Sequence, residues 1–400
     1  MKNFKDSGIE WLGEIPQHWE VSKFKYFYRS NMGETILTQD LKDEGIPIYS
    51  ATEDDKFFGK IKNPINILNI NDFVIPARGN SIGAVKIVKE KSTCTQTTIF
   101  SKQFKEINPY YVYYFLLGYR KFLFEFIQTA IPQITIGQVN DNPILYPPLK
   151  EQEQIANFLD EKCEQIKNFI EKKEKLITLL KEQKQAFINE ATTKGLDKNV
   201  NFKDSGIEYL GEIPQHWEVR KLKYITYVRN QKNNNIDFKI GLENIESKTG
   251  KYIPTSEMVF EKDGIEFKSG DILFGKLRPY LAKVFLANKN GICVSEFLVL
   301  KIKSENNKFI KFLMLSSLFI DIVDGSTYGT KMPRASWEFI GNLKIPLPPL
   351  KEQEQIANFL DEQCEKIDLL IEKTEKQIKL IKEYKTTLIN QAVCGRIRKN

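Results

Sequence analysis

The sequence "PPLKEQEQIANFLDE" occupies Pro147–Glu161 and returns unchanged at Pro348–Glu362. The paired prolines suit the start of a helix, where a missing backbone N–H costs nothing. No further glycine or proline interrupts the first copy until Gly195, a residue type that commonly ends helices. The sequence therefore predicts a helix from Leu149 to about Thr192, roughly 65 Å long at 1.5 Å per residue.

Apolar residues recur along both predicted helices at alternating spacings of three and four. In the seven-residue (heptad) repeat abcdefg these are positions a and d. Nine of the eleven a and d positions are apolar in each copy, while the other faces carry Lys, Glu and Gln. So narrow and long a stripe is typical of a coiled-coil seam. The predicted seam residues are Leu159, Ile166, Ile170, Ile177 and Leu180 in the first helix and Leu360, Ile367, Ile371, Ile378 and Ile381 in the second.

A second repeat opens each half of the chain. "FKDSGIEWLGEIPQHWEV" at Phe4–Val21 and "FKDSGIEYLGEIPQHWEV" at Phe202–Val219 differ at one position. We call these two stretches the head segments. Between each head segment and its helix lies an insert, at about 22–146 and about 220–347. The chain therefore has the order head segment, insert and helix, written twice.

The two inserts are related but not alike. The stretch from Asp72 to Cys94 aligns without gaps with Asp271 to Cys293, and its apolar pattern persists while its polar residues differ. This pattern predicts one fold used twice to recognise different things, although simple drift after duplication is the alternative. Short apolar runs indicate strands and longer ones indicate helices, which gives an α+β class. The expected strands include 71–77, 84–88, 271–277 and 297–302, and the expected helices follow Asn108 and Asn307.

The simplest way to bury both seams within one chain is to pair the two helices. Two like units related by a pseudo-twofold axis would pair them antiparallel. We therefore expect two similar α+β domains joined by two long helices that form an antiparallel coiled coil. Two independent stalks that bind other proteins are the alternative. The expected boundaries are 1–147 for the first domain, 148–198 for the first helix and linker, 199–347 for the second domain and 348–400 for the second helix.

The composition excludes several classes of protein. With 400 residues, 41% apolar and 28% charged, the chain can bury real cores. No apolar stretch is long enough to span a bilayer, and the start "MKNFKDSG" lacks a signal core, so we expect a cytoplasmic protein without membrane contact. The net charge of +7 is compatible with nucleic acid without proving it. The five cysteines have no CxxC spacing, which favours reduced thiols.

Catalytic motifs are missing from the sequence. Its two histidines, His18 and His216, both lie inside the head segments. "GDILFGKL" nearly matches a phosphate-binding loop, but Leu277 replaces the hydroxyl that would bind magnesium. "NPYY" at Asn108–Tyr111 lacks the second proline and the glycine-rich loop of an amino-methyltransferase. We expect no catalytic residue, no metal site and no cofactor on this chain.

The whole chain resembles the specificity subunit of type I restriction–modification enzymes. The resemblance rests on "SGIEWLGEIPQHWEV", "YPPLKEQEQIANFLDE" and "GTKMPRASWEFIGNLKIPLPPLKEQ" at Gly329–Gln353. It implies two target recognition domains, each binding half of a split, asymmetric site in double-stranded DNA. It also implies two methyltransferase subunits and two restriction subunits, which are translocase–nucleases. S-adenosylmethionine, ATP and magnesium would belong to those partners. The alternatives are a free-standing two-headed DNA-binding regulator and a coiled-coil scaffold that binds no nucleic acid.

Side chains that contact DNA should lie on loops of the inserts and carry cations or paired hydrogen-bonding groups. Each candidate could equally be an ordinary solvated side chain. The candidates in the first insert are Arg78, Asn80, Ser81, Lys86, Gln96, Thr97, Gln133, Thr135 and Gln138. The candidates in the second are Lys276, Arg278, Tyr280, Lys283, Ser295, Lys331, Arg334 and Ser336.

Overall fold

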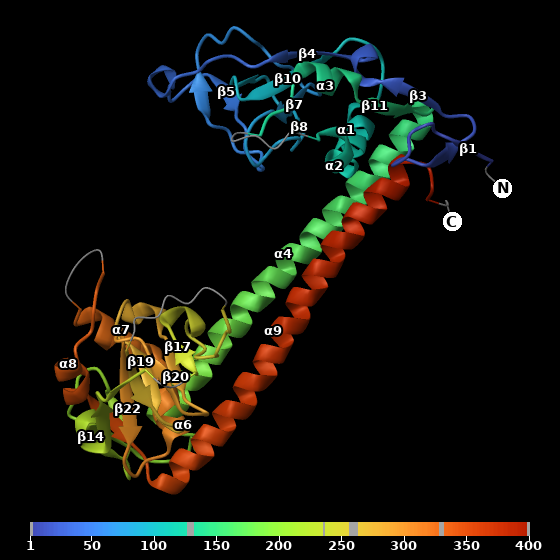
Figure 1. Ribbon diagram of the computed structural model, residues 1–400. Helices are drawn as coiled ribbons and strands as arrows, with labels where there is room; N and C mark the ends of the chain where they lie inside the picture. Colours follow the sequence, from blue (N-terminus) through green and yellow to red (C-terminus); the bar gives the residue numbers. More distant parts are fainter. Residues whose placement is uncertain (1–2, 126–131, 235–236, 256–262, 328–331, 398–400) are drawn as a thin grey trace. The chain divides into compact units, whose positions relative to one another are not determined.

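The chain forms two compact units in the computed structural model (Figure 1), which describes residues 3–125, 132–234, 237–255, 263–327 and 332–397. The first unit comprises residues 1–173 and 376–400, and the second comprises residues 174–375. Each unit therefore holds one head segment, one insert and parts of both long helices.

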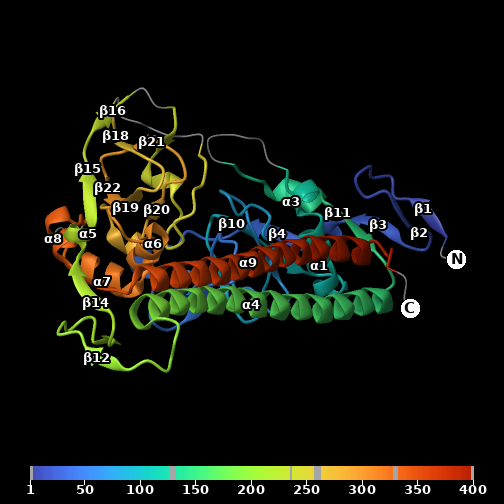
Figure 2. The same ribbon diagram turned by 90° about the horizontal axis from the view of Figure 1, so that it is seen from below.

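The long helices are α4 (Leu149–Lys194) and α9 (Leu350–Val393). As predicted, Gly195 follows the end of α4, with a left-handed φ of 78°. In the first unit Leu159, near the start of α4, shares a core with Leu388, near the end of α9. In the second unit the rings of Phe187 and Phe359 lie 6.0 Å apart. The helices are therefore paired antiparallel within each unit (Figures 1 and 2), which excludes two separate stalks.

The predicted seam residues are among the less exposed side chains of α4 and α9. All ten predicted seam residues are buried or half-buried. The buried members are Leu159, Ile166, Leu180, Leu360, Ile367 and Ile378.

Each insert folds around an antiparallel four-stranded sheet of the same strand order, β4-β10-β7-β8 in the first unit and β15-β22-β19-β20 in the second. The predicted relation between the inserts is therefore confirmed at the level of the sheet. The strands of the first sheet are β4 (Tyr28–Met32), β10 (Thr98–Gln103), β7 (Phe73–Pro76) and β8 (Lys86–Ile87). Those of the second are β15 (Thr226–Arg229), β22 (Phe297–Ile302), β19 (Ile272–Gly275) and β20 (Val284–Leu286).

The second sheet of each insert differs between the two, with three strands in the first insert and four in the second. The first has the order β6-β5-β9 and the second has the order β16-β18-β21-β17. Both contain one parallel pair, β5 with β9 and β17 with β21. The strands are β5 (Ile46–Tyr49), β6 (Gly59–Ile61), β9 (Thr93–Cys94), β16 (Lys232–Asn233), β17 (Lys239–Ile240), β18 (Gly264–Phe267) and β21 (Gly291–Cys293).

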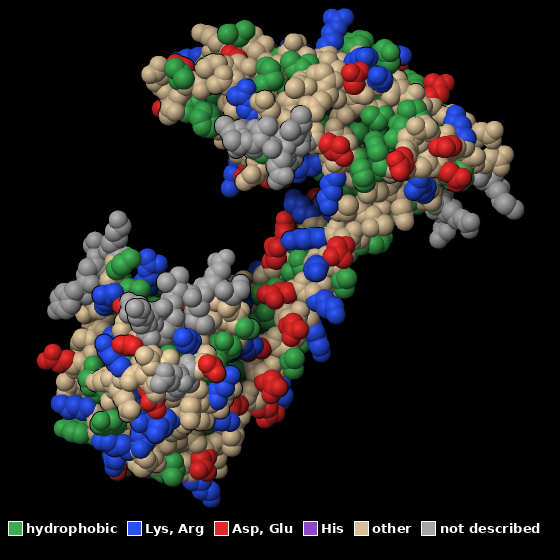
Figure 3. Space-filling view, viewed as in Figure 1, with side chains coloured by type: hydrophobic (Ala, Val, Ile, Leu, Met, Phe, Trp, Pro, Cys, Tyr) green, Lys and Arg blue, Asp and Glu red, His purple; other side chains and the backbone are tan. Residues whose placement is uncertain are grey.

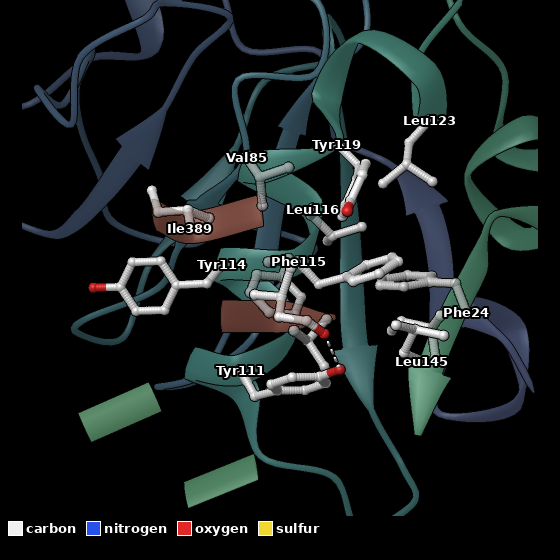
Figure 4. Close-up of a cluster of buried hydrophobic side chains, with 14 of the residues drawn as sticks. Phe24, Val85, Tyr111, Tyr114, Phe115, Leu116, Tyr119, Leu123, Leu145 and Ile389 are labelled. Carbon is white, nitrogen blue, oxygen red and sulfur yellow. Dashed lines mark hydrogen bonds between the residues drawn. The ribbon is translucent and has the colours of Figure 1, made fainter. Parts of the chain in front are cut away.

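Helices pack against these sheets and complete the core of each unit. Figure 4 shows Tyr111, Phe115 and Tyr119 packed together in the first unit. The predicted helix after Asn108 is confirmed, because the Asn108 side chain accepts a hydrogen bond from the Tyr111 N–H at 2.9 Å. These helices are α1 (Pro109–Gly118) and α2 (Arg120–Leu123) in the first unit, and α6 (Asn307–Leu315) and α7 (Ser317–Gly325) in the second.

The single helix predicted after Asn307 is wrong in two details. Its cap is Asn306, which accepts hydrogen bonds from two backbone N–H groups. The helix also breaks at Ser316, whose extended backbone and buried hydroxyl start α7. A serine favours helix starts because its hydroxyl competes for backbone hydrogen bonds.

Each head segment leads into a strand that pairs with the strand directly before the long helix. In the first unit β3 pairs with β11, so both ends of the insert lie side by side, and β14 pairs with β23 in the same way. These strands are β3 (Glu20–Lys23), β11 (Pro143–Tyr146), β14 (Glu218–Lys221) and β23 (Lys344–Leu347). The remaining elements are β1 (Phe4–Asp6), β2 (Glu14–Pro16), β12 (Phe202–Asp204), β13 (Glu212–Pro214), α3 (Ile136–Asp141), α5 (Leu222–Ile225), α8 (Trp337–Asn342) and short 3-10 turns at 24–26, 38–40, 242–244 and 279–281.

Candidate nucleic-acid interface

Three loop segments of the first insert meet at one place, residues 77–81 after β7, 95–97 before β10 and 132–135 before α3. The Ala77 N–H donates to the Thr97 carbonyl at 2.9 Å, and the Ile134 N–H donates to the Ala77 carbonyl at 3.0 Å. The Gly79 N–H donates to the Pro132 carbonyl at 3.2 Å. Backbone bonds therefore fix these segments into one surface, which we call the first three-loop surface.

The second insert builds the same arrangement from residues 276–280, 294–296 and 333–336, the second three-loop surface. The Lys276 N–H donates to the Glu296 carbonyl at 2.8 Å, and the Ala335 N–H donates to the Lys276 carbonyl at 3.0 Å. The Arg278 N–H donates to the Pro333 carbonyl at 2.8 Å. These are the same three bonds at the aligned positions, so the two inserts share one backbone frame.

The side chains on the two frames differ. The first surface carries one charged residue, Arg78, beside the exposed amides of Asn80, Gln96 and Gln133. The Gln96 amide oxygen accepts a hydrogen bond from the Thr35 hydroxyl at 2.8 Å. Ser81 and Thr97 of the same surface are half-buried, and the Thr97 hydroxyl lies 2.9 Å from that of Thr95.

The second surface is more cationic. It carries Lys276, Arg278 and Arg334, with Glu296 as its acidic residue. Arg278, Arg334 and Ser295 are exposed, as is Tyr280 at 46%, whereas Lys276 is half-buried. The Arg334 guanidinium donates to Glu296 Oε1 at 2.8 Å.

One position of the shared frame requires a left-handed backbone. In the first insert Gly79 occupies it, with φ of 78°, and glycine adopts this conformation without cost. The aligned residue of the second insert is Arg278, with φ of 51°. A non-glycine residue in this region is strained, and such strain concentrates at functional sites.

Three predicted candidates act as helix caps. Thr135 Oγ1 accepts from the Gln138 N–H at 3.2 Å, and the Thr135 N–H donates to the Gln138 side chain at 2.8 Å. Ser336 Oγ accepts from the Phe339 N–H at 3.2 Å. The sequence "TIGQ" at 135–138 matches the capping-box pattern, a signal that could have indicated this role.

Two predicted candidates have hydrogen-bond partners within their own inserts, and one of them lies on a strand and not on a loop. Lys86 is only 2% exposed on β8, and its ammonium donates to the Ser50 carbonyl and the Thr52 hydroxyl. Lys283 donates to the Leu242 carbonyl at 2.6 Å. Burial lowers the pKa of both lysines. They hold loops in place and are left out of the interface, while Lys331 lies outside the described residues.

Sequence reasoning missed Glu296. It considered only cations and groups that could bind bases directly, so it ignored an acidic residue that holds an arginine. The two inserts align at this position as Thr97 and Glu296, which was the only available signal.

The described part of the chain shows no arrangement typical of a metal site or of a membrane-spanning helix. There, no group of three or more His, Cys, Asp or Glu side chains is arranged to hold a metal ion. Within the same residues no helix has the length and apolar character needed to cross a membrane. The five cysteines are free and buried.

Two α+β domains with one loop frame and two sets of side chains define a two-headed recognition protein. Residues 16–182 and 214–380 each match the type I restriction modification DNA specificity domain. The chain therefore belongs to the family of type I restriction–modification specificity subunits and carries two copies of its DNA specificity domain.

Known proteins resemble the chain over nearly its whole length. The type I restriction enzyme MjaVIII specificity subunit of Methanocaldococcus jannaschii is 28% identical, covering 99% of this chain and 96% of that protein. The EcoDI specificity subunit of Escherichia coli is 21% identical, covering 96% and 90% respectively.

Solved structures share the fold. A chain from a study of complex assembly and conformational transition in the type I R-M system matches with a TM-score of 0.71 at 12% identity, covering 96% of this chain and 99% of that one. The HsdS subunit from Thermoanaerobacter tengcongensis matches with a TM-score of 0.54 at 15% identity, covering 96% and 98%.

Proposed function

We propose that each three-loop surface binds one half of a split DNA site in the major groove. The observation that carries this proposal is the shared backbone frame with unlike side chains, because a fixed frame with exchangeable side chains is suited to binding different base sequences. Asn and Gln amides pair with adenine, and Arg pairs with guanine, so both surfaces hold groups for direct contact with bases. An asymmetric site follows from the difference between the surfaces.

Cations on these surfaces would supply affinity for phosphate. Arg78 on the first surface, and Arg278 and Lys276 on the second, can replace condensed counterions along DNA. The strained backbone of Arg278 supports this role, because glycine at that position would relieve the strain and lose the cation. Binding should therefore weaken steeply as salt rises.

The long helices would dock the partner subunits. Apolar side chains remain exposed away from the seam, namely Phe169, Leu380 and Tyr384 in the first unit and Leu176, Leu179, Leu369 and Leu370 in the second. All of them except Leu369 occupy heptad positions g or c, and in an antiparallel pair the g positions of both helices flank the same side of the seam. Figure 3 shows hydrophobic side chains among charged ones along the helices.

The division of labour follows from this arrangement. The chain recognises DNA in the cytoplasm and lacks a catalytic role of its own. Two methyltransferase subunits would bring S-adenosylmethionine, and two restriction subunits would bring ATP and magnesium. This arrangement is preferred to a free-standing two-headed regulator because exposed apolar side chains beside a helix seam suit a partner protein.

Methylome sequencing of cells with and without this chain tests the proposal. We expect one split, asymmetric methylated motif to disappear when the chain is removed. A methylome that does not change while the chain still binds DNA would favour the free-standing regulator. Absence of DNA binding by the assembled complex would contradict both.

A further inference from the structure

Arg334 is held in one orientation on an otherwise open surface. Its side chain is 60% exposed, and its guanidinium donates to Glu296 Oε1 at 2.8 Å. The backbone of Arg334 is also fixed, because it forms a β-bridge with Leu277. An arginine with both ends fixed loses less freedom when it forms a bidentate contact.

Stability alone does not account for the Arg334–Glu296 pair. An ion pair with one partner this exposed contributes little to folding. Glu296 is only 25% exposed, and its second oxygen, Oε2, is buried without a hydrogen-bond partner among the described residues. A carboxylate kept partly out of water beside an exposed arginine fits a role in positioning that arginine.

At the position of Arg334 the two domains carry side chains with different hydrogen-bonding groups. Gln133 is the aligned residue of the first insert, and it forms the equivalent β-bridge with Arg78. An arginine offers only donors, whereas a glutamine amide offers a donor and an acceptor. In the major groove guanine presents two acceptors, and adenine presents one acceptor and one donor.

We propose that Arg334, positioned by Glu296, determines a guanine in the half-site bound by the second domain. This inference rests on the proposed function and adds to it the identity of one base. Arg334 is the specificity-determining residue, and Glu296 is a positioning residue that acts through it.

The test compares variants of the full chain, each expressed with its partner subunits as the only specificity subunit of the cell. Arg334→Gln places the first domain's residue on the second surface. We expect one guanine of the methylated motif to become relaxed or to change to adenine, with the other half-site and the gap unchanged. Glu296→Gln should relax the same position less strongly.

Binding measurements with the purified complex give the second reading. Duplexes that carry the original guanine or another base at that position should differ by roughly 5- to 150-fold in affinity for the unsubstituted chain, the range expected of one bidentate contact. With Arg334→Gln this discrimination should be lost. Lys301→Gln is the control, because Lys301 is an exposed cation near the other end of β22 from Glu296.

Two results would overturn the inference. If Arg334→Gln left the motif unchanged, Arg334 would not determine a base. If it weakened binding to all duplexes equally and reduced the salt slope by about one, Arg334 would contact phosphate instead. In both cases the unsubstituted chain would still direct a split motif, so DNA recognition itself would stand. Loss of that motif from the unsubstituted complex would instead contradict the proposed function.

Discussion

The indole N–H of Trp217 donates a hydrogen bond to Glu352 Oε1 at 3.1 Å. This bond joins the second head segment to the first turn of α9. His216 Nε2 lies 2.7 Å from the other oxygen of the same carboxylate. The first unit repeats the arrangement with Trp19 and Glu151, which also lie 3.1 Å apart. The repeated head segments and the repeated helix starts therefore have the same role in both units, which is to fix each domain on the start of its long helix.

Glu352→Ala should destabilise the protein by about 1–3 kcal/mol, because it leaves the N–H of a fully buried tryptophan without an acceptor. Urea unfolding measures this difference. Glu354→Ala is the control, because Glu354 is exposed on the same turn, and its effect should stay within about 0.5 kcal/mol. Equal effects of the two variants would mean that the carboxylate does not join the head segment to the helix.

Asp368 of α9 is held by two lysines within the second unit. Lys184 donates to its two oxygens at 2.8 and 2.9 Å, and Lys251 lies 2.9 Å away. Burial alone would raise the pKa of Asp368, but the hydrogen bonds from the lysines outweigh it, so the pKa lies below its ordinary value of 3.8. We therefore expect Asp368→Asn to cost about 1.5–3 kcal/mol at pH 7, the range for hydrogen bonds to charged groups.

The pH dependence of that cost follows from the sign of the shift. A carboxylate whose folded pKa is lowered contributes its full stability above the unfolded pKa, and loses it as pH falls through the folded value. The difference between Asp368→Asn and the unsubstituted chain should be constant from pH 7 to about pH 5, and shrink below about pH 4. Asp361→Asn serves for comparison, because its pair with Lys308 is exposed and should contribute at most about 1 kcal/mol. A difference that grew as pH fell would contradict the assignment.

Sequence reasoning predicted the long helices because a heptad repeat is local information. It also predicted strands β7, β8, β19 and β22 and one fold for both inserts, because short runs rich in apolar residues indicate strands. It could not separate free cations from bound ones. The ammonium of Lys86 is satisfied in its buried position by the Ser50 carbonyl and the Thr52 hydroxyl, more than thirty residues away, and no local pattern records such a contact. The role of Glu296 depends in the same way on Arg334, which lies on a distant segment.

Arg278→Gly should stabilise the second unit by about 0.5–1 kcal/mol. Glycine relieves the strain of the left-handed backbone at this position, although part of the gain is offset because glycine also raises the conformational entropy of the unfolded chain. The same variant should weaken DNA binding by the assembled complex at every sequence and reduce the salt slope by about one. Gly79→Ala is the reverse case in the first unit. No atom lies within 4 Å of the added Cβ, so this variant should lose about 1 kcal/mol of unfolding free energy through its backbone conformation alone. Unchanged binding by Arg278→Gly would show that the arginine is not a phosphate contact.

Substitutions of two leucines of α9 can distinguish the seam from the proposed docking side. Leu360 is fully buried in the second unit, whereas Leu370 is 50% exposed. Leu360→Ala should cost about 2–5 kcal/mol of stability, because it removes buried methyl groups and leaves a cavity. Leu370→Ala should change the unfolding free energy by no more than about 0.5 kcal/mol.

Binding of the partner subunits should depend on the exposed leucines, although these contribute little to the stability of the fold. Leu370→Ala combined with Leu179→Ala removes exposed apolar area from both helices of the second unit, so co-purification of the methyltransferase subunits should weaken although the fold is intact. Ala substitution of the exposed polar residues Glu372 and Glu182 is the matched control, with one change on each helix. If the leucine variant retained its partners as firmly as the control, the exposed apolar side chains would not be the docking side. A docking surface elsewhere on the chain would then have to be sought.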